Sequence, residues 1–89
     1  GNADLADWAA SVDADNRAIR LGLGVFADAG NAAALAQQFA LVGAVTEEPV
    51  TVDGRPATRL TLTRLKPGAT KQDAFDLARE LGLTDAILY

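Results

Sequence analysis

The chain contains no cysteine, no histidine and no methionine among its 89 residues. Without cysteine it has neither disulfides nor thiolate metal sites, and without histidine it lacks the most frequent acid–base catalyst. Its only serine, Ser11, has no base near it in the sequence. No pair of acidic residues has a spacing that predicts carboxylates facing each other across a glycosidase cleft. We therefore expect a binding protein that is not an enzyme and that uses no metal and no cofactor.

Long apolar runs and an excess of positive charge are also missing. No apolar stretch approaches the length of a membrane span and no signal peptide is visible, so we expect no direct membrane insertion. The net charge of −4 argues against nucleic acid as a partner, because phosphate binding needs a basic surface. Since a start methionine is absent, we expect the chain to be a domain of a longer protein.

Residues 1–16 differ in charge from the rest of the chain. They contain four aspartates and no basic residue, whereas the arginines occur later. Leu5, Trp8, Ala9 and Val12 have helical spacing, which predicts a short amphipathic helix followed by a linker. The simpler interpretation is an arm that docks on the domain edge through Trp8; the alternative is a lid over the sheet. The main domain is expected over 17–89.

Two strand–helix units are predicted, and the first begins the domain. Apolar residues alternate with Arg20, Gly22 and Gly24, which indicates a strand with one apolar face over 17–26. A helix over 31–43 follows, with its apolar residues at the spacing of one helical face. A strand with an apolar face packed under such a helix is the expected result.

The second unit repeats this order near the end of the chain. Residues 58–65 alternate, with Arg59, Thr61 and Thr63 on the polar side. A second helix is predicted over 70–82, where threonine caps the start and glycine ends it. The two units together favour an internal duplication.

The segment between the two units predicts an edge strand and a hairpin. Residues 45–52 alternate less well and contain Pro49, which cannot donate a ladder hydrogen bond. Asp53-Gly54 is typical of a type I′ turn, so this strand and the next should be antiparallel neighbours. Glu47-Glu48 are interpreted as charges that keep the edge soluble. A last strand is predicted over 83–89.

The element order is therefore β-α-β-β-α-β, an α+β fold of the ferredoxin-like or RNP-like kind. It has a four-stranded antiparallel sheet with two helices on one face, here with a short N-terminal helix added. The first and third strands are central, and the face away from the helices is open. The polar positions of these two strands are the candidate site residues: Arg20, Gly22, Gly24, Arg59, Thr61 and Thr63.

Short motifs connect the chain to a known family. Leu23-Gly24-Val25-Phe26, the Asn-Ala-Ala-Ala-Leu-Ala motif at 31–36 and Leu81-Gly82-Leu83-Thr84-Asp85-Ala86 resemble the SPOR (sporulation-related repeat) domains of bacterial envelope proteins. The resemblance covers residues 17–89. Members include domains of rare-lipoprotein-A-type septal lytic transglycosylases and of cell-division proteins. The resemblance implies an RNP-like domain of a longer, exported protein of the bacterial periplasm or cell envelope. Such a domain binds peptidoglycan glycan strands without stem peptides and so marks the division septum.

The chain departs from the family pattern at several positions. Gly22 stands where the family commonly has glutamine, and Val25 stands where it has serine. The second unit keeps Arg59 and the apolar alternation, but not the usual glycine, proline and aromatic residue. Arginines, threonines and two glycines therefore remain as the expected contacts.

These residues suit a glycan. N-acetylmuramic acid without its peptide carries a free carboxylate, which an arginine can bind bidentately, and threonine hydroxyls can reach sugar hydroxyls. Gly22 and Gly24 would let a sugar ring lie against the backbone. Sugar sites usually add an aromatic platform, for which Tyr89 and Trp8 are the candidates.

Three other interpretations stay open or are set aside. The arginines can form a merely solvated face, with glycine marking a β-bulge. RNA binding on the same fold needs aromatic residues on the central strands, where this acidic chain has arginine, glycine and threonine. The principal alternative is a protein-interaction module that no longer binds glycan. Its partners would be other envelope or division proteins.

Overall fold

The computed structural model describes residues 17–89, so the helix and linker predicted for 1–16 lie outside the described residues. The elements, in chain order, are β1 (Ala18–Phe26), α2 (Ala29–Phe39), β2 (Gly43–Val52), β3 (Arg55–Leu65), α3 (Lys71–Glu80) and β4 (Ile87–Leu88). The prediction of an α+β fold with a four-stranded antiparallel sheet and two helices is confirmed. The arrangement is compatible with a ferredoxin-like fold.

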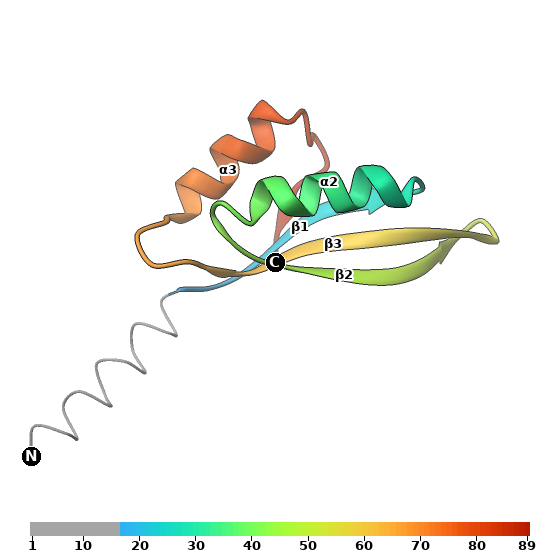
Figure 1. Ribbon diagram of the computed structural model, residues 1–89, viewed down its shortest axis with the longest axis horizontal. Helices are drawn as coiled ribbons and strands as arrows, with labels where there is room; N and C mark the ends of the chain where they lie inside the picture. Colours follow the sequence, from blue (N-terminus) through green and yellow to red (C-terminus); the bar gives the residue numbers. More distant parts are fainter. Residues whose placement is uncertain (1–16) are drawn as a thin grey trace, which may run out of the picture.

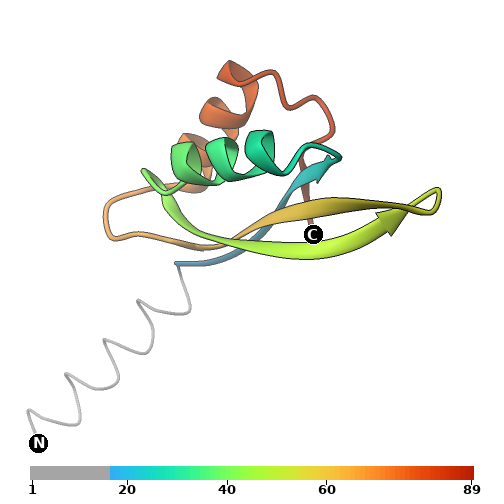
Figure 2. The same cartoon turned by 45° about the vertical axis from the view of Figure 1, so that its right-hand side comes forward.

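The sheet has the strand order β2-β3-β1-β4, and all neighbouring strands are antiparallel. β3 and β1 are therefore the central strands, and β2 is an edge strand, as Pro49 predicted. Both helices lie on the same side of the sheet (Figures 1 and 2). The opposite side, called here the open face, is covered by neither helix.

The core lies between the helices and the apolar side of the sheet. Leu21 and Leu23 of β1 and Leu60 and Leu62 of β3 are fully buried, as their alternation predicted. Phe39 at the end of α2 is also fully buried. Burying side chains of this size stabilises a fold by about 1.5–3 kcal/mol each. The same alternation turns the polar residues of both strands toward the open face.

Side-chain caps fix where the two helices begin. The Asp28 carboxylate accepts a hydrogen bond of 2.9 Å from the backbone N–H of Asn31 at the start of α2. Thr70 and Asp73 form a reciprocal capping box at the start of α3, with hydrogen bonds of 3.0 and 2.9 Å. Such caps satisfy backbone N–H groups that have no partner within the helix.

The β2–β3 hairpin turns at two residues with positive φ, Asp53 (53°) and Gly54 (78°), as expected for a type I′ turn. Pairing then runs without interruption from Val52 and Arg55 at the turn to Val45 and Leu62. β3 thus begins three residues before its predicted start at 58. The hairpin projects past the ends of both helices (Figure 1).

The last strand is shorter than predicted. β4 contains only Ile87 and Leu88, whereas a strand over 83–89 was expected. The preceding residues form turns instead, with backbone hydrogen bonds from Leu83 to Ala78 and from Ala86 to Leu83. The apolar character of this stretch reflects packing of Leu83 and Ala86 against the core and not strand alternation.

The alternation of β1 is interrupted at Gly24. The β1–β3 register shifts between Gly22 and Gly24, and Gly24 has a φ of 133°, which side-chain-bearing residues rarely adopt. Beyond this bulge Val25 is exposed and Phe26 packs against the core. Gly24 therefore has a structural role in bending the strand, as the bulge interpretation predicted.

Candidate functional site

The open face carries a groove of about 500 Å³. Its lining comes from β1, β2, β3 and the residue after β4: Arg20, Thr46, Glu48, Arg59, Thr61, Thr63 and Tyr89. Four of the six predicted site residues are thus brought together. The other two, Gly22 and Gly24, line an adjoining groove of about 350 Å³, and both grooves share Arg59 and Tyr89.

Strand register explains why these side chains meet. Thr61 on β3 lies opposite Thr46 on β2 and opposite Gly22 on β1. Arg59 lies opposite Glu48 on β2. Because side chains at alternate positions share one face of a sheet, these cross-strand pairs form parallel rows across the open face.

The groove contains an ion pair and a second arginine. Nη1 of Arg59 lies 3.7 Å from Oε2 of Glu48, and the two side chains are 50% and 57% exposed. No described residue forms an ion pair with Arg20. The Thr63 hydroxyl donates a hydrogen bond of 3.3 Å to the backbone carbonyl of Ala44. Arg20 and the free donors of Arg59 are therefore available to an anionic ligand.

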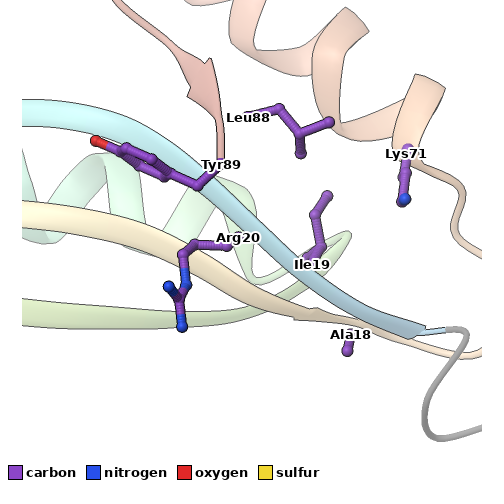
Figure 3. A pocket seen from close by; sticks show the side chains of 6 residues that line it. All are labelled: Ala18, Ile19, Arg20, Lys71, Leu88 and Tyr89. Carbon is purple, nitrogen blue, oxygen red and sulfur yellow. The ribbon is translucent and has the colours of Figure 1, made fainter.

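Tyr89 forms one side of the groove, and Gly22 makes room for it. A Cβ atom at position 22 would lie 2.9 Å from Cε2 of the tyrosine ring and 3.3 Å from its hydroxyl oxygen. The backbone N–H of Tyr89 donates a 2.9 Å hydrogen bond to the carbonyl of Arg20, so the ring and the guanidinium start from adjacent backbone positions (Figure 3). The ring is held at one edge of the groove while most of its surface stays exposed.

This placement corrects the expectation for the two glycines. Gly22 was expected to let a sugar ring lie against the backbone, but the protein's own Tyr89 occupies that position. A Cβ at Gly24 would lie 3.1 Å from the Phe26 ring. Both glycines therefore accommodate aromatic rings of the same chain. Tyr89 is the aromatic residue that the sequence offered for the open face; the other, Trp8, lies outside the described residues.

Two groove residues were missed from the sequence. Thr46 was not considered, and Glu48 was interpreted only as an edge charge. The signal was nevertheless present, because a two-residue turn at Asp53-Gly54 fixes the hairpin register. Counting outward from that turn pairs Glu48 with Arg59, as the structure does.

Other kinds of site find little support in the part of the chain that the structure describes. Within 17–89, no three His, Cys, Asp or Glu side chains are grouped so that they could hold a metal ion. No helix in this range has the length and apolar character needed to cross a membrane.

No model of a known protein family matches the chain, and no curated protein or solved structure matches it either.

Proposed function

We propose that this chain is a SPOR-like domain that binds peptidoglycan glycan strands lacking stem peptides, without catalysing a reaction. The open-face groove is the binding site. The domain would thereby target a larger periplasmic envelope protein to the division septum. The observation that carries the proposal is the grouping of two arginines, two threonines facing each other and an exposed tyrosine in one groove on the two central strands and their neighbours.

The chemistry of the groove fits such a strand. Each N-acetylmuramic acid residue without a peptide carries one carboxylate, for which Arg20 and Arg59 supply charge-assisted hydrogen bonds. Thr46 and Thr61 offer hydroxyls for sugar hydroxyl and acetamide groups. The exposed face of the Tyr89 ring, which is 76% exposed as a residue, offers an apolar surface for a sugar ring.

The fold supports the same proposal. We assign the domain to the ferredoxin-like or RNP-like βαββαβ class, because its element order and its strand order follow that pattern. In such a fold the two helices cover one side of the sheet and leave the central strands accessible on the other. An elongated polymer can lie across that accessible side without displacing any helix.

Co-sedimentation with purified sacculi tests the proposal. Sacculi are used intact and after amidase digestion, which strips the stem peptides and exposes the carboxylates. We expect binding to increase after digestion. We expect Arg59→Ala to weaken it about 10-fold or more, since a hydrogen bond to a charged group is worth about 1.5–3 kcal/mol.

Arg55→Ala is the matched control, because Arg55 lies on the same strand but lines a different surface, near the hairpin turn. Both variants should melt close to the wild-type temperature, since the Arg59–Glu48 pair is solvent-exposed and such pairs contribute at most about 1 kcal/mol. If the folded wild-type domain sediments with neither preparation, glycan binding is refuted.

A second candidate function is a SPOR-like protein-interaction module that joins an envelope complex. The observation in its favour is a pair of exposed apolar side chains, Val25 of β1 and Ile87 of β4, which line the same groove. Apolar side chains grouped at a strand edge are typical of surfaces that contact other proteins. Absence of sacculus binding, together with loss of complex formation in Ile87→Ser, would favour this function.

A further inference from the structure

Glu48 is the one acidic side chain among the described residues that line the open-face groove. Arg20 and Arg59 line the same groove, which therefore contains two positive charges and one negative charge. Its carboxylate contacts Arg59 at 3.7 Å, which is longer than a hydrogen bond. Arg59 is therefore partly neutralised but keeps its hydrogen-bond donors free.

The position of Glu48 is fixed by the hairpin. The two-residue turn sets the β2–β3 register, which places Glu48 opposite Arg59 and the preceding Glu47 opposite Leu60. Paired residues point to the same face of the sheet, and Leu60 is buried on the helix side. Glu47 therefore lies on the helix side, on the opposite face from Glu48. Two adjacent glutamates of equal charge thus differ in which face of the sheet they occupy.

The ion pair is weak enough for a ligand to replace it. Both side chains are about half exposed, and exposed pairs of this kind contribute little to stability because water screens them. A ligand carboxylate can therefore take the place of Glu48 at Arg59. Glu48 itself remains attached to β2 and stays within a few ångströms of the bound ligand, where it repels any second negative charge nearby.

We propose that Glu48 is a specificity-determining residue, which restricts the groove to polymers with widely spaced anionic groups and rejects those with a negative charge on every unit. A glycan with one carboxylate per disaccharide satisfies this condition. A nucleic acid strand, with a phosphate on every nucleotide, does not. The inference depends on the proposed function for the identity of the accepted ligand, whereas the rejection of dense charge follows from the groove itself.

Glu48→Gln and Glu47→Gln form a matched pair of variants. Each removes one negative charge from the same strand, so both change the net charge of the chain equally, but only the first changes the groove. The rejected class of ligand is represented by a fluorescein-labelled oligouridylate, whose binding is followed by fluorescence anisotropy at several salt concentrations. Denuded sacculi represent the accepted class.

We expect Glu48→Gln to bind oligouridylate about fivefold more tightly than wild type, the effect of removing one like charge at about 4 Å in water. Its salt dependence should also steepen, because each additional phosphate contact adds about 0.7 to the logarithmic slope for a single strand. Glu47→Gln should match wild type.

Equal gains in the two glutamine variants would show an effect of net charge and would overturn the proposal, as would no gain in either. The sacculus assay separates this result from the proposed function. If wild type does not bind denuded sacculi while Glu48→Gln alone gains oligouridylate binding, the charge selection holds and glycan binding fails. If wild type binds denuded sacculi and the two variants respond alike to oligouridylate, glycan binding holds and the role of Glu48 fails.

Discussion

Gly43, the first residue of β2, is the glycine among the described residues where an added Cβ atom would meet the closest neighbouring atom. A Cβ atom there would overlap the backbone carbonyl oxygen of Arg64, and it would lie 3.0 Å from the carbonyl carbon and 3.1 Å from Cδ1 of Leu62. The obstacle is mainly backbone, which cannot move aside by changing a rotamer. Gly43→Ala would therefore force β2 and β3 apart at the end of their ladder.

The size of the effect follows from the cost of overpacking. Extra carbon in a well-packed site costs about 1–3 kcal/mol and occasionally more, and contact with backbone belongs at the upper end. We expect Gly43→Ala to lose about 3 kcal/mol of the free energy of unfolding. For a domain of this size the melting temperature should fall by about 12–24 °C, at roughly 4–8 °C per kcal/mol.

Gly54→Ala makes the same chemical change where space is open. No atom lies within 4 Å of a Cβ there, but the φ of 78° carries strain of about 1–2 kcal/mol for alanine. Urea unfolding followed by circular dichroism compares the two variants, with an unchanged m value as the sign that both remain two-state. A loss at Gly43 no larger than that at Gly54 would refute the steric argument.

Two further predictions concern a cap and the groove. Thr70→Ala removes the capping box at the start of α3 and should cost about 1 kcal/mol, whereas Thr84→Ala, at an exposed turn position, should change the melting temperature little; equal effects would contradict the role of the cap. Tyr89→Ala should weaken binding to denuded sacculi about fivefold with little change in stability, because the side chain is largely exposed, while Tyr89→Phe should retain binding. Equal loss in both tyrosine variants would assign the effect to the hydroxyl and not to the ring.

The sequence predicted those parts of the fold that depend on local rules. Alternation identified the buried leucines of β1 and β3, and the Asp53-Gly54 turn identified the hairpin. The threonine cap located the start of α3, whereas α2 begins two residues before its predicted start at 31. In each case the determining residues are close together in the chain, so the physical cause can be recognised without knowing the tertiary contacts.

The features that the sequence did not predict depend on contacts between segments that are distant in the chain. The short β4 follows from the way residues 82–86 turn back on α3, and only then does Tyr89 reach Gly22. The bulge at Gly24 arises where β1 pairs with β3, and glycine alone does not distinguish a bulge from an open binding surface. Glu48 is different, because counting from the turn would have placed it opposite Arg59.

The brevity of β4 has a consequence for how the groove responds to a ligand. Ile87 and Leu88 pair with only two residues of β1, and both side chains are exposed. A segment held by so few contacts opens locally at a much lower free energy than the whole domain unfolds. Since Tyr89 is anchored to β1 through its bond to the Arg20 carbonyl, hydrogen exchange at its amide should slow when the groove is occupied. One backbone N–H thus reports occupancy of the site.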